Sequence, residues 1–588
     1  MKRLSATVCL LVAGCSSDGD VGEGPDGGPS EVPPDGQDVL ALTLSPGDTE
    51  LVARSDEAAE QDYVAEAELA DGTLVDVSEG AQFSVEDQAI GEFEASRFVA
   101  SGAAGGKTTV TARYGGAQAE ADLVVRVERT SVDDSAPPEA PDLFDDADED
   151  AERAPAIEYP SHLTMFPPNI GDFEIHWTDG AASDLFEVRL SGEFADLRVY
   201  VSGDASSETF AALAPDDWAV AGESERGGDL ELTVRGLDTA DPTTAGTSDP
   251  ITALLADEDV EGGVYYWASS GERPEGIYRH DMAAPGEPAE PFYTREEAGD
   301  CVACHALSRD GEKMAVTYEG GDGPASILDV ATATPTTPEG DDEPAWNFAT
   351  FDPEGDYLVT VHGGEMVLRD AGDGSIVEDV PTDGYATHPD FSPSGDAVVY
   401  VKPSSASQDW IFSGGSVVVQ SIDLDDYSFG EVITLVDADQ GHNFYYPSFS
   451  PDGEWVVFNR STGNSYDDAS AEVYIVPSDG SEQPERLDSP NVESGLTNSW
   501  ARWAPFSQTL DAGEGEEPHF WLTFSSKRSF GVRLDGGAPQ IWMAPFFPER
   551  ALAGDDPSAP AFRLPFQDIG THNHIAQWTE KIVVPPIE

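Results

Sequence analysis

The sequence predicts an all-β protein in which two N-terminal β-sandwiches precede a β-propeller of six blades, with seven as the alternative count. Short runs that alternate apolar and polar residues are separated by Gly and Asp turns about every ten residues, which is typical of β-structure. A turn motif between two β runs recurs along residues 259–588, which indicates a propeller. The length of 588 residues predicts several domains.

The N-terminus has the pattern of an export signal. Met1-Lys2-Arg3 is followed by an apolar run too short to span a membrane, so residues 1–14 are predicted to be a signal peptide. Val12-Ala13-Gly14-Cys15 resembles a bacterial lipobox, which implies that Cys15 carries the lipid that attaches the protein to a membrane. Two serines follow Cys15, and by resemblance to diderm lipoproteins this implies the outer membrane of the cell envelope. The alternative is a secreted protein without a lipid.

The charge of the chain limits its partners. The formal net charge is −85, from 114 acidic and 29 basic residues. Nucleic acid is excluded as a partner because phosphate binding needs a basic surface. The charge either keeps the protein soluble or attracts a basic redox protein partner. Residues 15–37, which are rich in Gly, Pro and Asp, are predicted to be a flexible acidic tether.

Two β-sandwiches are expected next. The segment 38–128 contains a D-G-T turn and the strand sequence G-K-T-T-V-T-A, and it resembles a bacterial Ig-like (Big) domain. Residues 129–155 are acidic and rich in proline, which predicts a solvated linker, since the spacing of an EF-hand is missing. Residues 156–258 alternate again and look like a fibronectin-type or Ig-like sandwich, in which His176 and Trp177 are packing residues.

The repeats define the C-terminal half. Each copy has an apolar residue, Ser or Asp, usually Pro, a variable residue and Gly, followed by a β run. Four copies begin at Leu307, Phe351, Phe391 and Phe449. Their wording, as in Phe449-Ser450-Pro451-Asp452-Gly453, resembles the TolB-like propeller blade, in which the motif joins the innermost strand to the next. Residues 263–279 look like a blade without its first strand, and residues 574–579 supply that strand. The beginning and the end of the propeller region are therefore predicted to form one blade together and to close the ring.

One motif carries chemistry. Cys301-Val302-Ala303-Cys304-His305 reads C-x-x-C-H, the attachment site of a c-type haem. The two thiols would bind the porphyrin and His305 would be an axial ligand of the iron. The other two cysteines, Cys9 and Cys15, lie in the export segment. The alternatives are a disulfide within the motif, or a zinc or iron site shared with histidines.

Aligning the repeats on their turns places the motif at an innermost strand. Cys304 then matches Phe348, His388 and Tyr446. Several histidines are expected to gather with His305 at one end of the central channel, where one of them would be the sixth iron ligand. The candidates are His572, His574, His388 and His442, with Met314 ranked lower because it lies inside a predicted strand.

Three functions remain open from the sequence. The first is electron transfer at the cell envelope by a lipid-anchored, cytochrome-like propeller with one haem. The second is a non-enzymatic, TolB-like propeller that binds a peptide or a partner protein, with the C-x-x-C as a disulfide or metal clip. The third is a redox enzyme with an open iron position, which is disfavoured because several histidines are expected to be near enough to fill that position. Fold alone does not choose among them.

Overall fold

The computed structural model describes residues 38–55, 59–203, 208–321, 323–338, 344–438, 441–511 and 516–584. The predicted signal peptide, the tether and Cys15 lie outside these ranges. The prediction of an all-β protein is confirmed, because within the described ranges strands dominate and the α-helices are short. No helix in these ranges has the length and the apolar character to cross a membrane.

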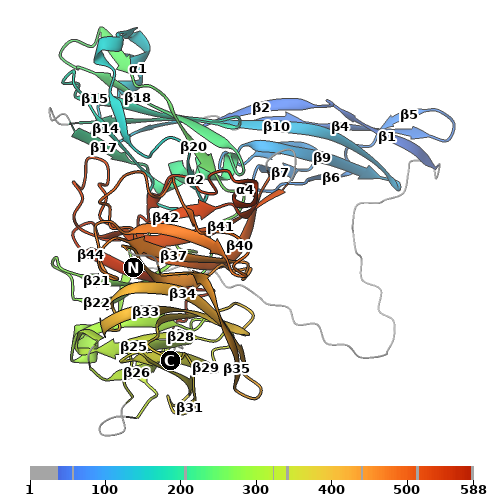
Figure 1. Cartoon of the computed structure of the whole chain (residues 1–588). Helices are drawn as coiled ribbons and strands as arrows, with labels where there is room; N and C mark the ends of the chain where they lie inside the picture. Colours follow the sequence, from blue (N-terminus) through green and yellow to red (C-terminus); the bar gives the residue numbers. More distant parts are fainter. Residues whose placement is uncertain are drawn as a thin grey trace, which may run out of the picture.

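The first region extends from the rest of the molecule as an arm (Figure 1). The small sheet β1-β4-β5 packs on β9 through Leu42, Ala65, Ala67 and Ala112. The strands of the first region are β1 (Val39–Ser45), β2 (Thr49–Arg54), β3 (Glu60–Asp62), β4 (Val64–Leu69), β5 (Leu74–Asp76), β6 (Gln82–Val85), β7 (Gly91–Glu94), β8 (Arg97–Ala100), β9 (Gly106–Tyr114) and β10 (Ala117–Val132).

The second region continues the large sheet that contains β10. Its strands and helices are α1 (Ala140–Asp146), β11 (Asp148–Glu149), η2 (Ala151–Arg153), β12 (Ala156–Tyr159), β13 (Thr164–Phe166), β14 (Glu174–Thr178), β15 (Leu185–Ser191), β16 (Ala195–Ser202), β17 (Glu208–Ala212), α2 (Pro215–Ser224), β18 (Asp229–Leu237), β19 (Thr244–Thr247) and β20 (Ile251–Leu255). The end of β10 pairs in parallel with β16, so one sheet crosses the boundary that was expected between the two regions.

The segment predicted as a solvated linker, residues 129–155, is structured. Its first residues belong to β10, and α1 buries Ala140 and Phe144 against Leu185 and Tyr200. The rings of Phe144 and Tyr200 lie 5.7 Å apart. A few apolar residues are enough to fix this segment while its acidic residues face water, which explains why composition alone suggested a linker.

Six four-stranded antiparallel sheets follow. They are β44 (His572–Thr579), β21 (Gly263–Ser269), β22 (Gly276–Asp281) and β23 (Glu290–Thr294); β24 (Val302–Leu307), β25 (Lys313–Tyr318), β26 (Ala325–Asp329) and β27 (Thr334–Pro335); β28 (Phe348–Phe351), β29 (Tyr357–His362), β30 (Glu365–Asp370) and β31 (Ile376–Asp379); β32 (Thr387–Phe391), β33 (Ala397–Gln408), β34 (Ile411–Asp423) and β35 (Ser428–Val436); β36 (Asn443–Phe449), β37 (Trp455–Ser461), β38 (Glu472–Pro477) and β39 (Glu485–Arg486); and β40 (Ser499–Asp511), β41 (Glu516–Ser526), β42 (Gln540–Phe546) and β43 (Phe562–Arg563). Short helices α3 (Arg295–Ala298), η3 (Glu319–Gly321) and α4 (Pro548–Ala553) lie between strands.

The six sheets form a closed ring. Their inner strands contact one another in the order β24, β28, β32, β36, β40 and β44, and β44 returns to β24. The C-terminal strand β44 pairs with β21, so the first sheet is built from both ends of this half of the chain. This is the arrangement of a β-propeller, in which closure protects sheet edges.

The repeated turn has a physical reason for its sequence. The first hydroxyl or carboxyl of the motif accepts a hydrogen bond from the backbone N–H five residues later, as Ser450 does from Trp455 at 3.0 Å. Asp352 does the same for Tyr357 at 2.7 Å. The glycine adopts a left-handed conformation, with φ of 76° at Gly453 and 72° at Gly355, which other residues rarely adopt. The turn therefore fixes the step from the first strand of a sheet to the second.

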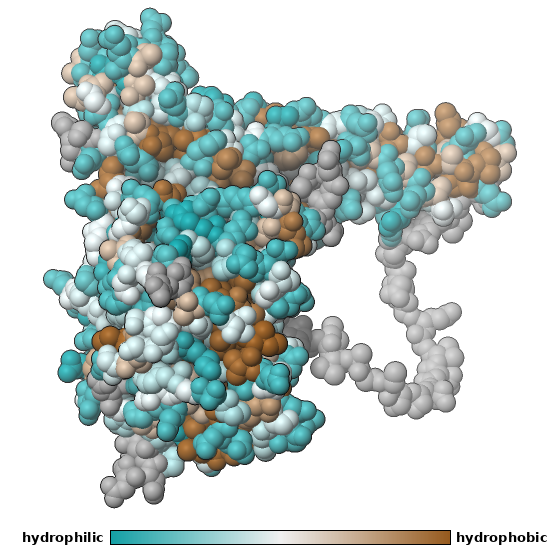
Figure 2. Space-filling view, in the orientation of Figure 1, coloured by the Kyte–Doolittle hydropathy of each residue, from teal (hydrophilic) through white to brown (hydrophobic). Residues whose placement is uncertain are grey.

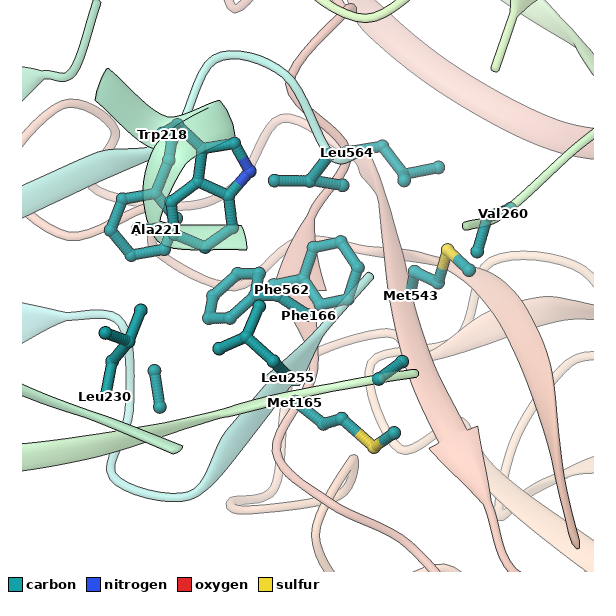
Figure 3. Close-up of a cluster of buried hydrophobic side chains, with 14 of the residues drawn as sticks. Met165, Phe166, Trp218, Ala221, Leu230, Leu255, Val260, Met543, Phe562 and Leu564 are labelled. Carbon is teal, nitrogen blue, oxygen red and sulfur yellow. The ribbon is translucent and has the colours of Figure 1, made fainter. Parts of the chain in front are cut away.

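A shared hydrophobic core joins the second region to the ring (Figure 3). Phe166 from β13 lies between Phe173 and Trp218 on its own side and Phe562 of β43 on the other, with 4.8 Å between the Phe166 and Phe562 rings. Phe166 and Trp218 are almost completely buried. The second region is thus fixed to the ring by packing.

This core predicts coupled unfolding. Phe166→Ala should lower the free energy of unfolding by about 3–5 kcal/mol, because it removes a buried ring and leaves a cavity. Denaturant unfolding followed by tryptophan fluorescence should show the second region and the ring weakened together. The control Ile376→Ala, at a side chain that is 58% exposed, should change stability by no more than about 0.5 kcal/mol. A second region that keeps its own unchanged transition in Phe166→Ala would contradict shared packing.

Candidate functional site

A collar of six side chains closes one part of the channel. Each inner strand contributes one of them: Cys304 from β24, Phe348 from β28, His388 from β32, Tyr446 from β36, Trp500 from β40 and Ile575 from β44. The rings lie in contact around the channel. The ring centroids of Phe348 and His388 are 4.4 Å apart, those of His388 and Tyr446 are 4.0 Å apart, and Tyr446 stacks on Trp500 with 3.8 Å between centroids. The expected alignment of Cys304 with Phe348, His388 and Tyr446 is confirmed.

The backbone is strained where it forms the collar. His388, Tyr446, Trp500 and Ile575 have φ values of 51°, 49°, 59° and 56°. A left-handed conformation at residues other than glycine costs on the order of 1–3 kcal/mol each. The strand pairing shifts register at the same places. These bulges turn the four side chains toward the channel, as bulges do beside functional sites.

A buried carboxylate anchors the hairpin beside the collar. Asp409, which is 1% exposed, lies between β33 and β34 and accepts hydrogen bonds from the Asn347 side chain at 2.5 Å and the Tyr385 hydroxyl at 2.6 Å. The backbone N–H groups of Gly363 and Gly364 also donate to it, both at 2.8 Å. These bonds join the fourth sheet to the third. Sequence reasoning missed Asp409 because carboxylates are so abundant in this chain.

The two cysteines of the motif are free and lie in different surroundings. The strand pairing shifts register between Val302 and His305, so the motif lies in a bulge of β24. The Cys301 sulfur is 3.7 Å from a Glu275 carboxylate oxygen, and burial together with that carboxylate raises the pKa of Cys301. Burial in the collar raises the pKa of Cys304 to about 12. Both thiols are therefore protonated at neutral pH.

His305 is enclosed beside the collar. It is 5% exposed, and burial lowers its pKa to about 4. Its two ring nitrogens are buried without a hydrogen-bond partner. With Cys304 and His388 it lines a cavity of about 20 Å³, which has room for about one water molecule. The buried Nε2 of His388 and Oδ1 of Asn347, both without partners, belong to residues that line this cavity too.

This arrangement does not fit a covalent haem. One porphyrin would have to reach the sulfurs of both Cys301 and Cys304 and place its iron on His305. The Cys301 sulfur lies beside Glu275, whereas Cys304 packs in the collar. The space beside His305 is about 20 Å³, and ligands of porphyrin size occupy pockets of hundreds of Å³. The haem therefore stays a prediction from the motif, and the cavity of about 20 Å³ beside His305 is too small to hold it.

The candidate sixth ligands are spread over several places. His388 lies in the collar, where burial lowers its pKa, and its Nδ1 accepts a hydrogen bond from the Tyr446 backbone N–H at 3.3 Å. His574 packs beside Trp267, with 5.9 Å between the rings, and burial lowers its pKa to about 4. His572 is exposed, 3.5 Å from the Ser270 hydroxyl.

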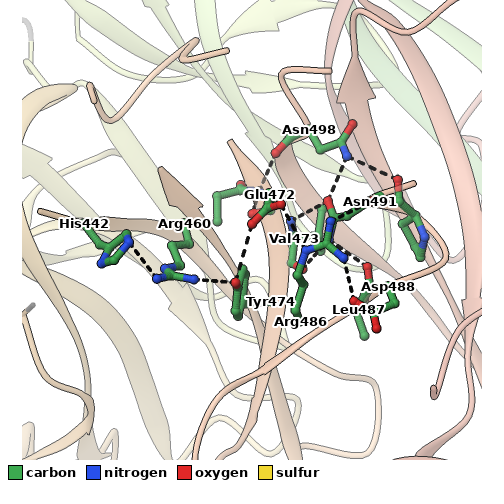
Figure 4. Close-up of polar contacts among 12 residues, drawn as sticks. His442, Arg460, Glu472, Val473, Tyr474, Arg486, Leu487, Asp488, Asn491 and Asn498 are labelled. Atoms are coloured by element: carbon green, nitrogen blue, oxygen red, sulfur yellow. Dashed lines mark hydrogen bonds and ion pairs between the residues drawn. The ribbon is translucent and has the colours of Figure 1, made fainter. Parts of the chain in front are cut away.

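The last two candidates serve other purposes. The His442 Nε2 lies 2.6 Å from Arg460, within a polar network that continues along the fifth sheet to Tyr474 and Glu472 (Figure 4). Met314 is fully buried in a cluster with Val302 between the first two sheets. Among the residues that the structure describes, no three His, Cys, Asp or Glu side chains are arranged to hold a metal ion.

A second and larger cavity lies at the end of the channel where the repeated turns follow the inner strands. Its volume is about 150 Å³, and all six inner strands contribute to its walls. Arg502 and Gln577 line both this cavity and the small one beside the collar. Asp390 is the carboxyl group that the fourth sheet contributes to the wall. Sequence reasoning identified neither Asp390 nor Arg502.

Comparison with known proteins finds no matching family model and no matching curated protein. Solved structures that are similar include TolB from Acinetobacter baumannii, at 13% identity over 59% of this chain and 79% of that one, with a TM-score of 0.36. A putative TolB from Agrobacterium tumefaciens shares 14% identity over 54% and 98%, with a TM-score of 0.30. An auxiliary nutrient binding protein from Bacteroides thetaiotaomicron shares 11% over 64% and 96%, with a TM-score of 0.28.

The cysteine environment predicts slow thiol chemistry. In the Cys301→Ser variant of the exported protein, alkylation of Cys304 at pH 8 should be on the order of a thousandfold slower than after unfolding, because a pKa near 12 leaves little thiolate. Mass spectrometry of alkylated peptides measures this, with Cys304→Ser as the matched variant. In the unmodified protein both thiols should react after unfolding without reductant. A need for reductant would indicate a disulfide, and no reaction at all would indicate thioether bonds to haem.

Proposed function

We propose that this chain is a cell-envelope lipoprotein whose TolB-like, six-bladed propeller binds a peptide segment of a partner protein without catalysing a reaction. Six four-stranded sheets in a closed ring support the propeller. The export signal and Cys15 of the sequence support lipid attachment at the outer membrane. The first region, which extends as an arm (Figure 1), would then separate the propeller from its anchor.

The observation that carries the binding role is the form of the channel. One stretch is filled by the collar, and the stretch beside the repeated turns keeps a cavity of about 150 Å³. Ligand sites are concave and contain a few placed polar groups, and Arg502 and Asp390 are such groups here. A cavity of this size accepts one protruding residue of a partner more readily than a large cofactor.

The protonation states near the collar favour binding over catalysis. Burial raises the pKa of Cys304 to about 12 and lowers that of His305 to about 4, so both groups are neutral at pH 7. Covalent catalysis by a cysteine needs a thiolate, usually formed beside a protonated histidine. The two residues are instead suited to packing within a rigid closure of the channel.

The charge of the chain supports a basic partner. Hydrophilic residues cover much of the face in Figure 2, and the net charge of −85 attracts basic proteins at long range. The association rate should therefore fall as salt is added, because exposed charges are screened within about 10 Å at 0.1 M salt.

Site-directed cross-linking tests the binding face. A photoreactive residue that replaces Pro393, in the wall of the larger cavity, should give an adduct with one defined peptide segment in envelope preparations. The same residue at Ile376, which is 58% exposed on the outer strand β31, is the control. Equal adducts at both positions, or none at Pro393, would contradict binding at the channel.

A further inference from the structure

Arg502 offers hydrogen bonds that the chain does not use. Its guanidinium donates to the Pro447 carbonyl at 3.1 Å. A guanidinium carries five N–H donors in one plane and cannot lose its proton in a protein. The described part of the chain places no carboxylate within ion-pair distance of Arg502, whereas Arg309, at the wall of the same cavity, pairs with Glu580 at 2.6 Å. Arg502 therefore keeps donors that face the channel.

Asp390 supplies an acceptor in the same cavity. It is half-buried, and one of its carboxylate oxygens accepts the Phe449 backbone N–H at 2.9 Å. A carboxylate has about four acceptor sites, so it can accept a further N–H from a ligand. Burial raises the pKa of Asp390, and the positive charge of Arg502 opposes this rise, so the two groups already interact across the cavity. The cavity thus presents a cation and an acceptor, both held by the inner strands.

We infer that the larger channel cavity binds the free C-terminus of a peptide, with the terminal carboxylate on Arg502 and the N–H of the last residue donated to Asp390. This inference rests on the proposed function and names the group that the channel recognises. Capture of a terminal carboxylate is a recurring mode of peptide recognition, and Arg binds carboxylates through two parallel hydrogen bonds. A volume of about 150 Å³ suits one terminal residue.

The charge of the chain restricts the rest of the peptide. A net charge of −85 repels acidic segments before they reach the channel. A carboxylate at the end of a basic segment avoids this repulsion, because the basic residues face the acidic surface and the carboxylate enters the cavity. The ligand class is therefore a basic peptide with a free C-terminus.

The test compares two probes on the full exported chain. A fluorescent Lys-Gly-Lys-Gly-Ala peptide with a free carboxylate should bind about tenfold to a hundredfold tighter than the same peptide with an amidated end, since hydrogen bonds to charged groups contribute about 1.5–3 kcal/mol. Fluorescence anisotropy at constant salt measures both affinities. Arg502→Gln should remove the difference, and Arg309→Gln should keep it.

Each outcome of this comparison supports or overturns C-terminal recognition. Equal affinity of the two peptides for the unmodified protein would overturn C-terminal recognition, and so would the absence of binding at about 1 mM peptide, the weak end of specific affinity. A difference that persists in Arg502→Gln would overturn the role of this arginine. The comparison of the two peptides uses the unmodified protein, so it stands even if the variant folds poorly. Cross-linking at Pro393 without peptide discrimination would leave the binding function in place and remove only this inference.

Discussion

Strand β44 closes the ring of six sheets, and this closure holds in place the inner strands that build the collar and the larger cavity. The pairing of β44 with β21 joins the C-terminal strand to the sheet in which the ring begins. Without it, β21 and the inner strands β24 and β40 would lose neighbours, and the collar would lack Ile575. Closure also hides the strand edges that would otherwise pair with other chains. The channel, its closed part and its open part all follow from this one pairing.

The closed ring holds the collar in a strained backbone conformation. Four of its six residues hold left-handed backbone conformations, and such strain persists only when the surroundings enforce it. Ring contacts of Tyr446 with His388 and Trp500 hold these conformations in place, together with the hydrogen bonds of Asp409 to the third sheet. The collar thus fills one stretch of the channel, and the stretch beside the repeated turns keeps a cavity of about 150 Å³. The packing of Phe166 on Phe562 then fixes the second region to the same rigid body.

Much of the fold could be predicted from short-range patterns, and much of the site could not. The Ser-Pro-Asp-Gly turns predict strand pairs because their hydrogen bonds are local, and alignment on them placed Cys304 in register with Phe348, His388 and Tyr446. The joining of the two N-terminal regions through β10, and the order within residues 129–155, depend on long-range pairing that composition does not encode. The C-x-x-C-H motif predicts haem from five residues, but the space beside His305 is set by Phe348, Trp346 and Trp500, which lie far away in sequence. Asp390 and Arg502 could not be identified from the sequence, because only the arrangement of the inner strands brings them to one cavity.

The collar closes the channel around Cys304 and His305, and we propose that the open cavity binds the ligand. A visible spectrum, oxidised and reduced, of the protein exported from a host with haem-attachment machinery tests it most directly, with a control cytochrome maturing in the same host. We expect no Soret band on the purified chain after acid extraction and denaturation. A band that survives this treatment and is lost in the Cys301→Ala/Cys304→Ala variant would show covalent haem, and the collar would have to open to hold it.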